Sequence, residues 1–284
     1  MRERTGSARL SGARLALAKE LLREALRARE AEFPLSAAPE RRPGLRRRLE
    51  ADLERYLEHA AERESPLEPR YLELGFGFGD RPAGDASEAE PDTRAPAGLP
   101  AGGLGEGGLS ASGLVDGAGP AAGAEQAEGA GLPALDLGDG LRLRGRIDRV
   151  DVAAGGGQAV VYDYKGRNAP PAAKWTEQGN VQVALYMRAV EELLGLEAAG
   201  GFYQPLSGGD LRARGVLDSE SGIEIECVRG EAREHAEMRE LLQEAVATAR
   251  MAAAQAGRGE LEPRPRTCAY RGGCTYPTIC RCEL

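Results

Sequence analysis

The chain has 284 residues, of which 42% are hydrophobic and 29% charged, values that are typical of a soluble protein with a folded core. No apolar run approaches the ~20 residues that cross a bilayer, so the sequence excludes a conventional transmembrane helix and membrane insertion. The N-terminus has no apolar signal region, so we expect a cytoplasmic protein.

The formal net charge of −8 is unevenly distributed along the chain. Between Asp80 and Ala134, nine acidic residues stand against two arginines, a net charge of −7 that leaves about −1 for the rest. The remainder is nearly neutral and carries local basic clusters such as Arg41-Arg42 and Arg46-Arg47-Arg48. The total charge therefore does not exclude DNA as a partner, and it gives no positive support for one.

The N-terminal part, residues 1–79, has the apolar periodicity of helices. Apolar residues at helical spacing predict one helix over about residues 8–33 and a second over about 43–63, followed by a short strand at residues 71–74. Glycine, alanine and proline then dominate the composition, and aromatic residues disappear after Phe78. We expect residues 80–134 to be a disordered insertion, because they cannot bury enough apolar surface to offset the entropy of ordering.

Residues 135–262 are expected to form the core of an α/β fold. The pattern predicts a strand through residues 141–147, a turn at Gly155-Gly156-Gly157 and a strand at residues 159–165, which together form a hairpin. Further on, it predicts helices at 178–194 and 232–256 and strands at 201–206 and 223–228. Residues 263–284, rich in proline, glycine and cysteine, are expected to be an irregular tail.

Two carboxylates and a lysine fall together on the predicted hairpin. Asp163 and Lys165 point to the same face because strand side chains alternate, and the hairpin brings Asp148 close to Asp163. Carboxylates suit Mg²⁺ or Mn²⁺, and the backbone carbonyl of Tyr164 is a plausible additional ligand. Lys165 would orient an attacking water or stabilise charge on a phosphate. Among 37 basic residues the chain has only three lysines, at positions 19, 165 and 174.

Gln182 and Tyr186 lie four residues apart, on one face of the predicted helix. They are expected either to contact a nucleic-acid backbone or to brace the carboxylate–lysine site. An Asp-x-Lys tripeptide alone is most often a solvated salt bridge; the order and spacing of all three segments is what indicates a nuclease. The sole tryptophan, Trp175, is expected to pack in the core more readily than to stack on a base.

These segments resemble the RecB/AddB-type nucleases of the PD-(D/E)XK superfamily. GRIDRVD is similar to the family segment that places a metal-binding aspartate at Asp148, and YDYKG to the one that places a second ligand at Asp163 and the catalytic lysine at Lys165. QVALY is similar to the family's Q-x-x-x-Y motif. Glu73 corresponds loosely to a glutamate that often precedes an insertion.

The resemblance implies a restriction-endonuclease-like fold and Mg²⁺-dependent DNA cleavage, exonucleolytic or directed at single strands, in recombinational repair and often beside a helicase. The family commonly has a further metal ligand upstream, often a histidine. His59 is expected on a helix surface and His235 follows the core, so Glu20 or Glu24 is left as a possible substitute. A catalytically inactive DNA-binding or scaffolding module is the alternative function.

Four of the five cysteines lie within the last 17 residues. Members of the family can carry a [4Fe–4S] cluster on such a tail, and the spacing of Cys274 and Cys280 matches the last pair of its pattern. Cys268 and Cys282 would complete four ligands. An iron–sulfur cluster is favoured over zinc, which prefers paired C-x₂-C knuckles, and over free thiols. Cys227 is expected to be an ordinary buried thiol.

Overall fold

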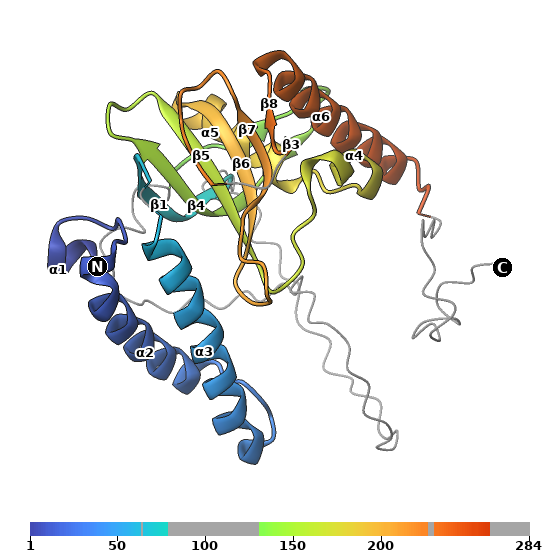
Figure 1. Cartoon of the computed structure of the whole chain (residues 1–284). Helices are drawn as coiled ribbons and strands as arrows, with labels where there is room; N and C mark the ends of the chain where they lie inside the picture. The colour runs from blue at the N-terminus through green and yellow to red at the C-terminus, as the bar shows by residue number, and fades with distance from the viewer. Residues whose placement is uncertain (64, 79–130, 227–229, 262–284) are drawn as a thin grey trace, which may run out of the picture.

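The computed structural model describes residues 1–63, 65–78, 131–226 and 230–261. They form an α/β fold around a six-stranded sheet of order β1-β4-β5-β6-β7-β8 (Figure 1). The strands of this sheet are β1 (Leu67–Phe76), β4 (Gly145–Ala153), β5 (Gln158–Lys165), β6 (Glu197–Pro205), β7 (Arg214–Asp218) and β8 (Ala232–Arg233). Two short strands, β2 (Leu135–Asp136) and β3 (Arg142–Leu143), pair separately.

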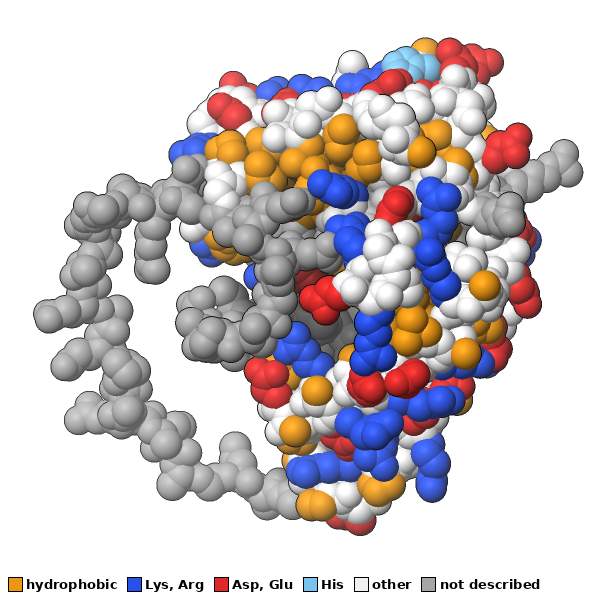
Figure 2. Space-filling model, turned by 90° about the vertical axis from the view of Figure 1, so that its left-hand side faces the viewer, with side chains coloured by type: hydrophobic (Ala, Val, Ile, Leu, Met, Phe, Trp, Pro, Cys, Tyr) orange, Lys and Arg blue, Asp and Glu red, His pale blue; other side chains and the backbone are white. Residues whose placement is uncertain are grey.

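The helices occupy different parts of the chain and different sides of the molecule. They are α1 (Arg2–Thr5), α2 (Leu15–Glu32), α3 (Arg42–Ala61), α4 (Trp175–Gln178), α5 (Gln182–Leu194) and α6 (His235–Gly257). In Figure 1, α2 and α3 form a hairpin that extends away from the sheet, and α5 and α6 lie on the body of the fold. Figure 2 shows Lys and Arg side chains gathered towards the far end of the α2–α3 hairpin.

The sheet mixes parallel and antiparallel pairs. Strands β1, β4 and β5 pair antiparallel in sequence order, and β4–β5 is the predicted hairpin, although the strand predicted through residues 141–147 is divided between β3 and β4, which starts at Gly145. Strands β5 and β6 are parallel, and α5 makes the crossover that a parallel connection requires. The α/β prediction is confirmed, and with it the expected mixed central sheet flanked by helices.

The core has two parts, one on each face of the sheet. The larger part packs α5 and the start of α6 against the sheet through buried residues such as Val161, Val183, Met187 and Met238. The smaller part lies on the opposite face and includes Tyr162, Phe202 and Ile223; the rings of Tyr162 and Phe202 stack there with centroids 5.8 Å apart. The sheet is therefore buried on both faces around the β5 strand that carries the predicted site.

One predicted strand is wrong and one strand was missed. Residues 223–226 form no strand: Ile223 and Ile225 alternate because one side of this segment packs on the smaller core. The strand that pairs with β6 is instead β7, which has no alternation because Gly215–Asp218 are all buried. Cys227, predicted to be a buried thiol, lies outside the described residues.

The boundaries of several other elements shift. Residues 178–194 are not one helix, because α4 ends at Gln178, capped by Gly179 in a left-handed conformation (φ 70°), and α5 begins at Gln182. The last helix starts at His235 because residues 232–233 pair with β7 as β8. The first helix begins at Leu15, after a 3₁₀ turn at Gly12–Arg14, and β1 is longer than the predicted strand.

Most of the predicted insertion, residues 79–130, lies outside the described residues, but its last residues do not. Leu132 packs against the larger core, and its carbonyl accepts the N–H of Gly77 at 2.9 Å. The end of β1 and the residues before β2 are therefore side by side, and residues 131–134 belong to the folded part. Among the described helices, none is both long and apolar enough to cross a membrane.

Candidate active site

The predicted site lies where β4 and β5 stop pairing. Their register runs from Val152 opposite Ala159 to Arg149 opposite Tyr162. Beyond that point, Oδ2 of Asp148 accepts the backbone N–H of Tyr164 at 2.7 Å. This bond fixes the Asp148 carboxylate beside the strand that carries Asp163 and Lys165.

Asp163 is a buried carboxylate with an unusual environment. Its side chain is 4% exposed, and the Lys165 Nζ lies 2.5 Å from its Oδ2. The two atoms are close enough for an ion pair, but Oδ2 has no well-aligned hydrogen-bond donor among the described residues. Burial raises the pKa of Asp163, and the neighbouring Asp148 raises it further, against the opposing effect of Lys165. A cation at this point would relieve both the desolvation and the repulsion.

Lys165 is held in position from α5. Its Nζ donates to Gln182 Oε1 at 3.2 Å, and Gln182 Nε2 donates to the hydroxyl of Tyr186 at 3.1 Å. The ammonium also lies 5.1 Å from the centre of the Tyr203 ring. Two roles were expected for Gln182 and Tyr186, and these hydrogen bonds correspond to the one in which they hold the lysine in place.

Gly145 lets the start of β4 approach α5 closely. A Cβ at this position would lie 2.9 Å from Cζ of Phe76 and 3.2 Å from Cε1 of Tyr186. The rings of Phe76 and Tyr186 meet edge to face, with centroids 6.2 Å apart. The glycine that opens the GRIDRVD segment therefore leaves room for the tyrosine that positions Gln182.

Glu73 adds a third carboxylate at the edge of the site. Leu72 pairs with Arg149 and Leu74 with Ile147, so Glu73 stands across from Asp148. Its backbone has φ 53°, a left-handed conformation that is uncommon for residues other than glycine and recurs at functional sites. Partial burial and then Asp148 raise the pKa of Glu73. Its side chain is 55% exposed and lies 3.8 Å from Arg146, so it sits farther out than Asp163.

The other proposed upstream ligands are engaged elsewhere. Glu20 and Glu24 lie 3.6 and 3.5 Å from the guanidinium of Arg4. His59 lies on α3 beside Arg63; burial and that guanidinium lower its pKa. Both glutamates therefore have Arg4 as a partner, whereas Glu73 is the carboxylate that stands across from Asp148.

A cleft of about 510 Å³ opens directly beside the lysine. Lys165, Gln182, Tyr186, Arg144, Asn180 and Tyr203 are among the residues that line it. It combines cationic and amide groups with aromatic surface, which suits a phosphate chain that carries bases. Trp175 does not line it: its side chain is buried and its Nε1 donates to the Pro170 carbonyl at 3.1 Å, which confirms the packing role.

The comparison with known families decides the classification. A family model described as the PD-(D/E)XK nuclease superfamily matches residues 4–281. This chain belongs to the PD-(D/E)XK nuclease superfamily. The match spans the helical hairpin, the sheet and the segment with Asp148, Asp163 and Lys165, and it extends into the cysteine-rich tail. A comparison with curated proteins found no match.

For a PD-(D/E)XK nuclease, the opposite face of β4 and β5 is also informative. Arg149 makes two hydrogen bonds to the buried Asp151, at 2.6 and 2.5 Å, and its Nη1 lies 3.4 Å from the hydroxyls of Tyr56 and Tyr164. This network ties α3 to the back of the strands that carry the site. The sequence analysis did not predict this network. The one signal for it was that Arg149 and Asp151 lie on the face of β4 opposite to Asp148.

The donor atoms present fit the Mg²⁺ or Mn²⁺ that PD-(D/E)XK nucleases typically use. Asp148 and Asp163 offer hard oxygen donors, and the buried Oδ2 of Asp163, which has only the Lys165 ammonium beside it among the described residues, is an atom that a second cation would help to satisfy. The four cysteines predicted to hold an iron–sulfur cluster or zinc (268, 274, 280 and 282) lie outside the described residues.

Proposed function

We propose that this chain is a Mg²⁺-dependent deoxyribonuclease in which Asp148, Asp163 and the Tyr164 carbonyl hold the ion. The observation that carries the proposal is the buried Asp163 carboxylate, whose Oδ2 has the braced Lys165 ammonium as its one partner among the described residues and lies next to a second carboxylate. A site built only for stability would not retain this combination, because neutral residues would avoid its desolvation and repulsion. Mn²⁺ would serve in place of Mg²⁺.

The chemistry follows from where the protein holds each group. When bound, the ion polarises a phosphate oxygen and lowers the pKa of a bound water. Lys165 is kept by Asp163 and Gln182 at the mouth of the cleft, where its ammonium donates to the phosphate or to the attacking water. Water adds to phosphorus, one ester P–O bond breaks, and the departing oxygen takes a proton.

We propose DNA as the substrate, cut exonucleolytically or as a single strand, in repair or recombination. The cleft supports this, because aromatic rings and an arginine line it together with the lysine. A helicase subunit or domain as partner, and the RecB/AddB type, rest on the resemblance of the three motifs alone. A [4Fe–4S] cluster on the four tail cysteines, with zinc as the alternative, rests on their number and spacing.

The chain provides its own matched control for a test of this function, because it has only three lysines. The assay is digestion of single- and double-stranded DNA by the purified protein with Mg²⁺ and with a chelator. We expect Lys165→Ala to lower the rate by about 10²–10³-fold, as loss of a preorganised charge donor does elsewhere. Lys19→Ala is expected to retain full activity, because Lys19 pairs with Glu54 and Glu58 between α2 and α3.

Two results would change the proposal. Equal cleavage by wild type and Lys165→Ala would remove the lysine from the chemistry. DNA binding by a folded wild type that cuts neither substrate with Mg²⁺ or Mn²⁺ would favour the inactive scaffolding module. Purification under anaerobic conditions with metal analysis tests the tail separately: iron–sulfur absorbance supports the cluster, and bound zinc without iron supports the alternative.

A further inference from the structure

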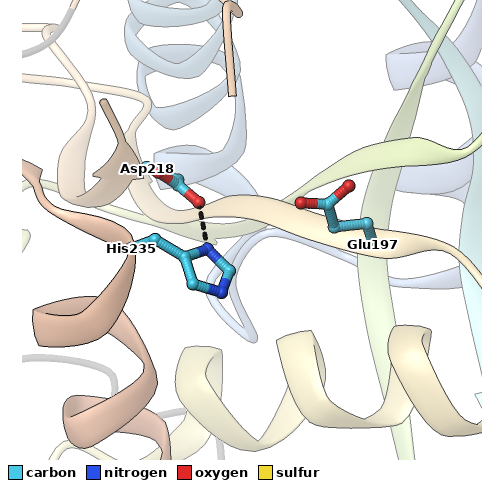
Figure 3. Close-up of side chains that lie close together, drawn as sticks. All are labelled: Glu197, Asp218 and His235. Carbon is cyan, nitrogen blue, oxygen red and sulfur yellow. Dashed lines mark hydrogen bonds and ion pairs between the residues drawn. The ribbon is translucent and has the colours of Figure 1, made fainter. Parts of the chain in front are cut away.

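At a second place in the fold, three side chains of types that can bind metal ions lie close together, although they are far apart in the sequence. Glu197 is the first residue of β6, Asp218 the last of β7 and His235 the first of α6. One ligand atom of each lies within 4.8 Å of the others. Figure 3 shows the Glu197 carboxylate turned towards the Asp218–His235 pair. Among the residues that the structure describes, this is the one such group of three.

Sheet topology brings the three together. Strands β6 and β7 run antiparallel, so the start of β6 meets the end of β7. Strands β7 and β8 are parallel with Asp218 opposite Arg233, which places His235 two residues beyond that pair. Each residue thus sits at the end of an element of regular structure, and such positions are more rigid than loops.

The imidazole is already oriented. His235 Nδ1 lies 2.6 Å from Asp218 Oδ2 (dashed line in Figure 3), and the Asp218 side chain is 2% exposed. The other Asp218 oxygen accepts the N–H of Glu220 at 2.8 Å, and Glu220 in turn accepts the N–H of His235 at 3.3 Å. The ring remains 45% exposed, so an ion has access to it from solvent.

The charge at this point is not balanced by the protein. Among the described residues, no lysine or arginine forms an ion pair with Glu197 or Asp218. Within the described part of the chain, the Glu197 carboxylate accepts one weak hydrogen bond, from Gln158 Nε2 at 3.5 Å, and the nearby Arg239 is paired with Glu191. Two carboxylates therefore face one imidazole, and the group stays negative whether or not the ring is protonated.

This cluster is separate from the candidate nuclease centre. Glu197 pairs with Gln158 at the start of β5, whereas Lys165 pairs with Pro205 at its end. Seven residues of strand separate the two positions, which corresponds to about 23 Å. An ion at one site would therefore make no contact with the ligands of the other.

We propose that Glu197, Asp218 and His235 bind a zinc-class transition-metal ion that clamps the start of α6 to β6 and β7. A set of one imidazole nitrogen and two carboxylate oxygens suits Zn²⁺, Ni²⁺ or Cu²⁺, whereas Mg²⁺ prefers oxygen ligands alone. The ion takes the place of the proton between His235 and Asp218, and the exposed Glu197 side chain swings in to close the site. Three protein ligands leave a fourth position for water.

The test is zinc binding by the full-length chain with all five cysteines changed to serine, so that thiolates do not compete. Calorimetry with Zn²⁺ is expected to give one equivalent bound at this cluster, in addition to any ion taken up at Asp148 and Asp163, together with a rise in the thermal unfolding temperature. We expect Glu197→Gln and His235→Ala each to weaken zinc binding at least about tenfold. Removal of a residue that only hydrogen-bonds to a metal ligand already reduces metal affinity by about that factor. Glu197 is exposed, so its variant keeps the proposal testable if the histidine variant folds poorly.

His59→Ala is the matched control, because His59 and His235 are the only histidines in the chain. It should bind zinc as the parent does, and so should Asp163→Asn, which alters only the nuclease centre. The imidazole resonances of His235 should shift on addition of Zn²⁺ while those of His59 stay in place. The proposal is overturned if the folded parent binds no zinc, if Glu197→Gln and His235→Ala bind it unchanged, or if Asp163→Asn abolishes binding.

Discussion

Asp163→Asn should make the protein more stable and less active at the same time. The carboxylate is 4% exposed, and its desolvation and the nearby Asp148 together raise its pKa in spite of Lys165. A raised pKa means that the charged form is disfavoured in the folded state, so ionised Asp163 costs stability at pH values above its folded pKa. The amide is nearly isosteric and removes that cost.

The size of the effect follows from the kind of interaction removed. A single stabilising substitution commonly gains about 0.5–2 kcal/mol, which for a chain of this size raises the unfolding temperature by about 2–4 °C per kcal/mol. Loss of a residue that only supports a metal ligand reduces activity by about 10–100-fold. Asp163 is itself a proposed ligand, so its replacement should reduce activity by more than that. Thermal unfolding in chelator and DNA digestion in Mg²⁺ measure the two quantities. The gain should shrink as the pH falls through the folded pKa, where wild type also becomes neutral.

Asp151→Asn is the opposite case and serves as the control. Asp151 is as buried as Asp163, but it accepts two hydrogen bonds from Arg149, so its loss leaves a partly buried guanidinium without its partner. We expect destabilisation of about 3 kcal/mol, at the low end for a broken buried pair because Arg149 remains 21% exposed. A loss of stability in Asp163→Asn, or full activity in that variant, would refute the account of Asp163 as a functional carboxylate held against its environment.

Two further outcomes are expected. Gly145→Ala should lower the free energy of unfolding by about 1–3 kcal/mol through overpacking, and it should reduce activity. Gly155→Ala is the control and should change neither, because Gly155 lies in a turn with open space around it. Equal effects of the two substitutions in guanidinium unfolding would contradict the packing argument. In chelator, proton NMR should give His235 a pKa above its ordinary value because of Asp218, and His59 a value below it. The stabilisation by the His235–Asp218 pair is present at low pH and is lost as the pH rises through the folded pKa of His235; Asp218→Asn should remove this dependence.

Local patterns in the sequence predicted the elements that carry the site. The glycine turn between two expected strands predicted the β4–β5 hairpin, although the first strand was placed too early in the chain, and helical spacing placed Gln182 and Tyr186 on one face of α5. These signals sufficed because the three motifs lie close together in the chain. The hydrogen bond from Lys165 to Gln182 then follows from the parallel crossover that α5 makes between β5 and β6.

Features that depend on long-range pairing were not accessible in this way. β7 is buried on both faces and therefore has no alternation, whereas the segment with Ile223 and Ile225 alternates because only one of its sides packs on the core. His235 was set aside because it follows the core in sequence, yet the register of β7 and β8 brings it to Asp218 and Glu197. Convergence of this kind becomes visible only when the strand order is known.

The most direct test of the central claim is the rate of single-stranded DNA hydrolysis in Mg²⁺ by wild type and by Asp148→Asn. The account predicts chelator-sensitive cleavage by wild type and a loss of at least about 100-fold in the variant, with binding of uncut DNA retained. Because Asp148 also accepts the Tyr164 N–H at 2.7 Å, circular dichroism must show that the variant is folded. Cleavage that persists in a folded Asp148→Asn protein, or that proceeds in chelator, would contradict a metal-dependent nuclease centred on Asp148, Asp163 and Lys165.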